Sequence, residues 1–153
     1  MVAFVPRDIA TWCAAYEAAP AVKRRAFWVG FLSSLAKYES TYREAAVGGG
    51  NRWFGLLQIA PSTARGYDCR ARTGAALQDG AENLSCAIRI LARTVPRDGV
   101  IHGYAGGKGL GVTADWAPMH KRVKRAEMAS WLQAQSYCQS PATVRPRGRV
   151  LVD

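Results

Sequence analysis

The hydrophobic pattern of the chain predicts a mainly helical protein, and its most informative segment is the helix expected at 21–42. Trp28, Leu32 and Leu35 recur there at spacings of four and three residues, so they share one helical face. Glu39 continues that face, which places a carboxyl group where the pattern calls for a core side chain. Burial would raise the pKa of this carboxyl and keep it protonated as a general acid. A glutamate at a frayed helix end, facing water, is the alternative interpretation.

Proline and glycine divide the rest of the chain into shorter elements. Pro20 ends a helix predicted at 8–19, and Asp79 with Glu82 has the form of a capping box for a helix that is followed by a break of the chain at Pro96 and Gly99. The other segments, in order, are strands within 52–59 after three glycines, a helix at 61–66, an irregular connection at 67–80, a surface loop at 101–111 and a helix at 115–137. The order predicts a mainly α (α+β) fold.

Length and composition indicate one globular domain, which we place at residues 1–139, followed by a basic Pro/Arg-rich tail at 140–153. No apolar run approaches the ~18 residues of a membrane span, and the first residues lack the apolar centre of a signal peptide. The net charge of +10 favours an anionic partner. No basic run alternates with aromatic residues, so we expect no nucleic-acid partner. We expect a monomer.

The cysteine and histidine content argues against a metal centre. The four cysteines form no C-x-x-C unit and the chain has only two histidines, so we expect no metal and no cofactor. The glycine-rich segment at 101–111 also fails the phosphate-loop pattern, because Lys108 is followed by glycine. An even number of cysteines favours disulfides, for which we prefer Cys69 with Cys86 and Cys13 with Cys138. Free buried thiols are the alternative.

Two linked motifs, the second of which runs directly into a helix start, carry a resemblance to a known family. The helix ends in Glu39-Ser40, the sequence GLLQI follows at 55–59, and the helix start APSTA comes next at 60–64. Together they resemble the lysozyme-like family of soluble lytic transglycosylases and goose-type lysozymes. The resemblance implies a lysozyme-like helical domain with a small β-hairpin beside its active-site cleft. It also implies an enzyme that cleaves peptidoglycan.

The resemblance assigns roles to individual residues. Glu39 would be the catalytic acid and base, while Gln58 and the backbone at Leu57 would hold sugar groups. Ser40 would support the helix end rather than touch sugar. Tyr104-Ala105-Gly106 resembles the family's third motif without its asparagine, so Tyr104 would position Glu39 or the substrate.

One family position differs in the glycine-rich segment. The family usually carries a serine where this chain has Gly48, so that substrate contact is missing or is supplied by Asn51. Asn83 matches a family asparagine at the start of a buried helix, where its role is mainly structural.

The reaction that the resemblance implies is cleavage of the β-1,4 bond between N-acetylmuramic acid and N-acetylglucosamine, leaving 1,6-anhydro ends. Glu39 would serve both proton transfers, because the muramic acid's own 6-hydroxyl is the nucleophile. Hydrolysis, by a lysozyme or a chitinase, is an alternative that needs a further acid, for which Asp68, Asp98, Asp115 and Glu44 are candidates. A non-catalytic module that binds cell wall is a second alternative. We expect action at the bacterial wall, periplasmic or extracellular, with export by a phage, a phage-like particle or a secretion apparatus.

Overall fold

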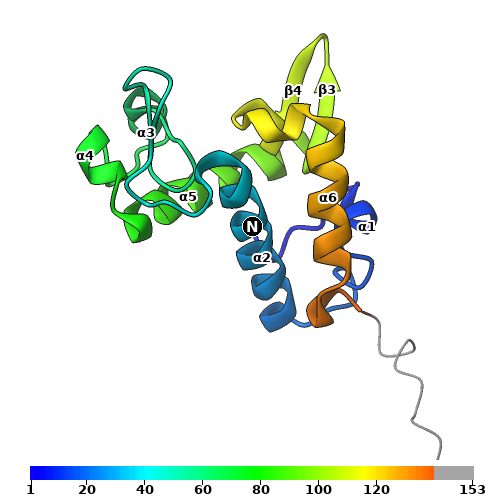
Figure 1. Ribbon diagram of the computed structural model, residues 1–153. Helices are drawn as coiled ribbons and strands as arrows, with labels where there is room; N and C mark the ends of the chain where they lie inside the picture. Colours follow the sequence, from blue (N-terminus) through cyan, green and yellow to red (C-terminus); the bar gives the residue numbers. More distant parts are fainter. Residues whose placement is uncertain (140–153) are drawn as a thin grey trace, which may run out of the picture.

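A computed structural model describes residues 1–139, which form helices and two small hairpins (Figure 1). The α-helices are α1 (Ile9–Trp12), α2 (Ala21–Ser40), α3 (Pro61–Gly66), α4 (Gly74–Leu77), α5 (Gly80–Asp98) and α6 (Arg122–Gln133). The strands are β1 (Val47–Gly48), β2 (Trp53–Phe54), β3 (His102–Ala105) and β4 (Lys108–Gly111), and the 3-10 helices are η1 (Val112–Ala114), η2 (Ala117–His120) and η3 (Ser136–Cys138). The predicted mainly α fold is confirmed. The tail predicted at 140–153 lies outside the described residues.

The two longer helices on the near side, α2 and α6, pack side by side (Figure 1). Helix α5 passes behind them, from the part of the molecule that holds α3 and α4 toward the hairpin β3–β4. Both hairpins are antiparallel, with β1 paired to β2 and β3 paired to β4. Among residues 1–139, no helix combines the length and the apolar character that crossing a bilayer requires.

Helix α2 is anchored at its base by a cluster of buried aromatic side chains. Phe27 and Phe31 are fully buried, and together with Trp28 and Tyr16 they form a cluster whose contacting rings have centroid distances of 5.1–6.4 Å. The Trp28 indole N–H donates to the Tyr16 hydroxyl at 2.8 Å, so the polar atoms within the cluster are paired. The stripe predicted from the sequence is therefore buried, with Leu35 at 0 % exposure. This packing fixes the direction in which α2 presents its last turn.

Helix α5 begins at a cap that the sequence predicts and carries a buried amide in its first turn. The Asp79 carboxylate accepts from the Glu82 backbone N–H at 2.9 Å. Asn83 is completely buried, and its side chain binds three backbone groups: it accepts from Leu57 N–H and donates to the carbonyls of Phe54 and Leu77. The structural role expected for Asn83 is thus visible as a link between β2, the following turn and α4.

Three predicted helices differ from the observed ones. The helix predicted at 8–19 ends at Trp12, because Cys13 takes an extended conformation where it joins its disulfide. Of the two predicted breaks, Pro96 lies inside α5, which continues to Asp98, whereas Gly99 does end the helix, with a φ of 73° that suits a glycine C-cap. The segment 115–137 is not one helix but η2, α6 and η3 in succession.

The loop predicted at 101–111 is a β-hairpin. Gly106 and Gly107 both have positive φ, 54° and 76°, which is the requirement of a two-residue primed turn. The base of the hairpin is held by Asp8, whose carboxylate accepts from the backbone N–H groups of Ile101 and His102. The connection predicted as irregular at 67–80 likewise contains the short helix α4, which Thr73 caps.

Both predicted disulfides are present. Cys13 is bonded to Cys138 and Cys69 to Cys86, and no free cysteine remains in the described part of the chain. The first bond joins the region after α1 to η3 across a separation of 125 residues, and the second joins the segment after α3 to α5 across 17. The pairing predicted from cysteine number and position is confirmed.

The two disulfides should stabilise the fold unequally. A cross-link removes more entropy from the unfolded chain when it closes a longer loop, so we expect its loss to cost about 5 kcal/mol for Cys13–Cys138 and about 3 kcal/mol for Cys69–Cys86. Double Cys→Ala variants of each pair remove identical atoms and are matched controls for one another. Urea unfolding of both variants measures the two free energies. A larger loss for the Cys69–Cys86 variant would contradict the expectation.

Candidate active site

The Glu39 carboxyl lies in the last turn of α2 and is mostly buried without a partner. Its Oε1 atom is inaccessible to solvent and accepts no hydrogen bond, and the side chain makes no ion pair with the described residues. The interpretation of Glu39 as a residue of the core-facing stripe therefore fits its environment, and the solvent-facing alternative does not. A buried polar atom without a hydrogen-bond partner costs stability. Glu39 differs in this respect from the other side chains of α2.

Burial also sets the protonation of Glu39. Removal from water raises the pKa of its carboxyl to about 7, and the Lys124 ammonium on α6 opposes part of that rise. The carboxyl is therefore partly protonated at neutral pH, as a general acid requires. The carboxyl therefore has a proton that it can donate, and its Oε1 atom makes no hydrogen bond within the protein.

The chain turns sharply after Glu39. Ser40 is buried, and its hydroxyl donates to the Ala36 carbonyl at 3.3 Å, so it supports the helix end rather than facing a cleft. Thr41 and Tyr42 both have positive φ, 55° and 62°. Two consecutive non-glycine residues with positive φ are uncommon. Here they end α2 directly after Glu39 and Ser40.

The GLLQI turn is fixed by hydrogen bonds on both sides of Leu57. Its N–H donates to Asn83 and its carbonyl accepts from the Trp116 indole at 2.9 Å, so both backbone groups already bind within the protein. Gln58, with φ of 46°, donates its amide N–H groups to the carbonyls of Ala46 and Gly55. The amide oxygen of Gln58 remains available as an acceptor.

Gly48, in the glycine-rich segment, leaves the space that the Gln58 amide occupies. A Cβ on Gly48 would lie 2.2 Å from the Gln58 amide oxygen, and one on Gly49 would lie 2.2 Å from the Trp53 ring. Both side chains therefore rest directly against the hairpin backbone. A serine at position 48 would need Gln58 to move, which gives a physical reason for the departure from the family pattern. Asn51 is exposed in the turn of this hairpin, with φ of 64°.

A pocket beside the GLLQI turn collects groups of the kind that bind sugars. Trp53 and Gln58 line it from the hairpin side, and Asp115 and Trp116 line it from the segment after η1. Trp53 is 43 % exposed, and the Arg52 guanidinium covers its ring at 4.9 Å. Local spacing places Trp53 in a predicted strand segment and Trp116 in a predicted helix, and it gives no indication that the two line one pocket.

The remaining predicted residues are placed as follows. The Tyr104 hydroxyl lies 3.0 Å from His120 Nδ1 and makes no hydrogen bond with Glu39, so the structure does not join these two predicted site residues directly.

Of the four candidate second acids, Asp68 pairs with Arg93 and Asp98 pairs with Arg97. Glu44 borders a separate hollow formed by residues 42–46 and Leu56. Asp115 alone among the four lines the pocket with Gln58, and burial raises the pKa of its carboxyl.

Comparison with known proteins agrees with this geometry. Residues 17–128 match the transglycosylase SLT domain family. The wild-type structure of DslA is 30 % identical and superposes with a TM-score of 0.80, covering 90 % of this chain and 82 % of that one. Two structures of DslA variants, each with one glutamate replaced by glutamine, match at 29 % and 30 % identity with the same TM-score and coverage. No curated protein sequence gives a significant match.

The family match covers most of the described chain and includes Glu39, Gln58 and Tyr104. The two disulfides fit a protein that works outside the reducing cytosol. This chain belongs to the transglycosylase SLT domain family, whose members are glycosidases of the lytic transglycosylase type that act on peptidoglycan.

Proposed function

We propose that the protein cleaves the β-1,4 bond between N-acetylmuramic acid and N-acetylglucosamine, with Glu39 as the acid and then the base. The observation that supports this most is the unpaired, half-buried carboxyl of Glu39, whose pKa lies near 7. A purely structural glutamate at this position would be expected to have a partner, because a buried charge without one is costly. A wall-binding module without catalysis would not need such a group.

The two proton transfers can be assigned to one carboxyl. Protonated Glu39 gives its proton to the glycosidic oxygen as the bond to the anomeric carbon breaks, which releases the N-acetylglucosamine side. The carboxylate then accepts the proton of the muramic acid 6-hydroxyl as that oxygen bonds to the anomeric carbon. Because the nucleophile belongs to the same sugar, it benefits from high effective molarity and no second carboxyl is needed.

The pocket beside Gln58 supplies the binding contacts in this proposal. The Gln58 amide oxygen accepts from a sugar N–H or hydroxyl, and the partly exposed Trp53 side chain borders the same pocket. Leu57 takes part by fixing the turn, since its own backbone groups are engaged. In this proposal the exposed residues Tyr104 and Asn51 contact the substrate farther from Glu39.

Hydrolysis is a second candidate because Asp115 lines the same pocket as Gln58. A carboxylate there would serve as the base that activates a water molecule, as in inverting glycosidases. The two outcomes differ by one water in the product.

Replacement of Glu39 by glutamine should abolish cleavage. The variant keeps the shape of the side chain and removes the proton, so we expect the release of soluble fragments from purified sacculi to fall by about 10²–10⁴-fold. Glu17→Gln, at an exposed position in the segment before α2, is the matched control and should retain activity. Near wild-type clearing by Glu39→Gln would exclude the assignment.

Activity and stability should both report the raised pKa of Glu39. Because the acid must start protonated, kcat/KM should fall as the pH rises through about 7. Folded Glu39 binds its proton more tightly than unfolded Glu39, so wild-type stability should fall between the unfolded pKa of 4.5 and about 7, by about 3 kcal/mol. Denaturant unfolding at several pH values measures this loss, which Glu39→Gln should not show.

A substitution on α6 provides the control for this pH dependence. Lys124→Met removes the ammonium that lowers the Glu39 pKa, so the decline of kcat/KM should move to higher pH. A decline that keeps its position in both Lys124→Met and wild type would mean that another group controls it.

Product masses should separate the two reactions. We expect muropeptides with 1,6-anhydro ends, each lighter by one water than its hydrolysed equivalent, in a digest of sacculi analysed by mass spectrometry. Asp115→Asn should leave these products and their rate largely unchanged. Hydrated ends that disappear in Asp115→Asn would instead establish hydrolysis with Asp115 as the second acid.

A further inference from the structure

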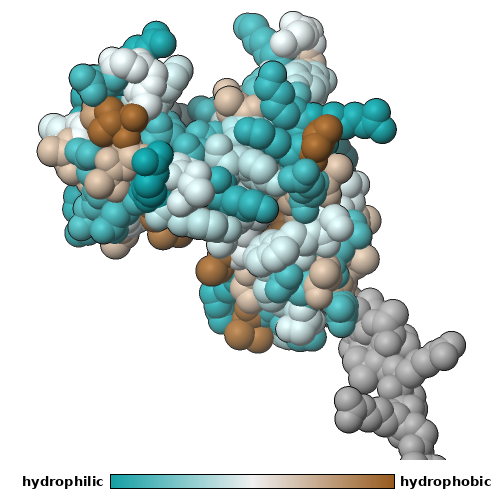
Figure 2. Space-filling view, in the orientation of Figure 1, coloured by the Kyte–Doolittle hydropathy of each residue, from teal (hydrophilic) through white to brown (hydrophobic). Residues whose placement is uncertain are grey.

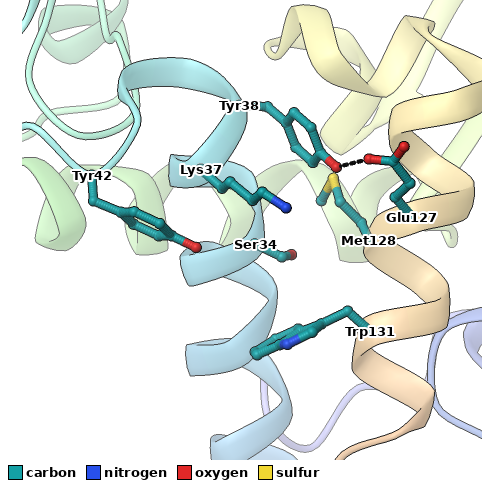
Figure 3. Close-up of a pocket in the computed structure, with 7 residues that line it drawn as sticks. All are labelled: Ser34, Lys37, Tyr38, Tyr42, Glu127, Met128 and Trp131. Carbon is teal, nitrogen blue, oxygen red and sulfur yellow. Dashed lines mark hydrogen bonds between the residues drawn. The ribbon is translucent and has the colours of Figure 1, made fainter.

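A second pocket lies between α2 and α6, next to the turn that carries Glu39 (Figure 3). Tyr38 and Glu127 close it at one end, where the Tyr38 hydroxyl donates to the Glu127 carboxylate, and the Trp131 ring lies at the other end. Lys37 extends from α2 into the space between them. None of these residues has a role in the cleavage mechanism.

The surroundings of the pocket have more positive charge than its own carboxylate balances, because Lys37 lines the pocket and Lys124, which is not a lining residue, lies beside Tyr38. The ammonium groups of Lys37 and Lys124 lie 5.4 and 5.2 Å from the centre of the Tyr38 ring. Neither lysine forms a salt bridge with a carboxylate among residues 1–139, and the Glu127 carboxylate is engaged by the Tyr38 hydroxyl. Two ammonium groups beside one aromatic ring and one occupied carboxylate favour a ligand that carries a carboxylate.

The walls of the pocket also offer apolar surface. Trp131 is 46 % exposed and Tyr42 is 56 % exposed, and the Met128 side chain completes the wall from α6. The space-filling view shows this face of the molecule as mostly hydrophilic or neutral, with strongly hydrophobic atoms only in isolated groups (Figure 2). The pocket is therefore suited to a ligand with both aliphatic and charged parts, and unlike an apolar docking groove.

The size of the pocket limits what it can hold. Its volume of about 170 Å³ is close to the ~150 Å³ of a cavity that accepts benzene, and smaller than the ~300 Å³ at which ligand sites usually begin. It can hold one side group but not a disaccharide. A group of this size is held usefully only if the rest of its molecule is bound nearby.

We propose that this pocket binds the stem peptide that branches from the muramic acid of peptidoglycan. This inference rests on the proposed function, because it takes the glycan strand to lie in the neighbouring cleft at Glu39. The peptide is the part of the polymer that combines carboxylates with short aliphatic side chains. Lys37 receives a peptide carboxylate, Lys124 adds positive charge from beside the Tyr38 ring, and the exposed Trp131 ring contacts the aliphatic part. The Tyr38–Glu127 hydrogen bond holds the two helices at the spacing that leaves the pocket open.

The test compares glycan strands with and without their peptides. Intact sacculi carry the peptides, amidase-treated strands keep only the lactyl carboxylate, and chitin oligosaccharides carry no carboxylate. We expect kcat/KM to be about tenfold higher on peptide-bearing strands than on amidase-treated strands, through KM rather than kcat. Lys37→Met and Trp131→Ala should remove most of that difference and leave cleavage of amidase-treated strands unchanged.

Two matched variants and a binding assay complete the experiment. Lys23→Met on α2 and Val123→Ala on α6 alter the same helices outside the pocket and should behave as wild type. Sedimentation of the Glu39→Gln chain with each polymer measures binding without cleavage, alone and combined with Lys37→Met. If wild type cleaves nothing, the proposed function fails, while the binding difference still decides the pocket's role. Equal binding of peptide-bearing and amidase-treated strands would overturn the inference, as would an equal loss on both in Lys37→Met, which would assign the lactyl carboxylate.

Discussion

The geometry of the site depends on one buried amide. Asn83 satisfies three backbone groups from segments that share no regular secondary structure with one another: the carbonyl after β2, the N–H of the GLLQI turn and the carbonyl at the end of α4. Without Asn83 the Leu57 N–H and the Leu77 carbonyl would lose the side-chain partner they have here, at a cost of about 1–3 kcal/mol for each buried group, while the Phe54 carbonyl would keep the Ile59 N–H. The Trp116 indole adds a second bond at Leu57, to its carbonyl. The orientation of Gln58 follows from these constraints rather than from any preference of its own.

The other side of the site is held by hydrophobic packing. The aromatic cluster around Phe27 and Phe31 anchors the first half of α2, and the buried Leu35 continues the contact to the last turn. A rigid helix cannot swing Glu39 into water without uncovering this core. The energy that packing contributes therefore keeps a carboxyl in a place that disfavours its charge. The packing of α2 thus stabilises the fold and also keeps the Glu39 carboxyl in an environment that raises its pKa.

Local spacing and covalent chemistry allow structural features to be predicted from the sequence. Features that depend on tertiary contacts do not follow from it. The stripe that ends in Glu39 and the Asp79 cap follow from spacing within short segments, whereas the even number of cysteines indicates disulfides but leaves three possible pairings, of which the observed one includes Cys13 with Cys138 across 125 residues. The early end of α1 at Cys13 and the passage of α5 through Pro96 depend on distant partners, namely Cys138 and the hairpin that Asp98 contacts. The Gly106-Gly107 turn was present in the sequence as a hairpin signal, but its strands are too short and glycine-rich to show alternation. The pairing of Trp53 with Asp115 in one pocket has no local signature at all.

The two faces of the last turns of α2 are linked through α6. Lys124 lies against the Tyr38 ring on one face and lowers the pKa of Glu39 on the other. A ligand carboxylate placed beside Lys124 would offset its positive charge and so weaken that lowering. The pKa of Glu39 would then rise, and more of the carboxyl would carry its proton when a peptide-bearing strand is bound. Since the acid must be protonated when the glycosidic bond breaks, occupation of the neighbouring pocket would favour the state of Glu39 that begins the reaction.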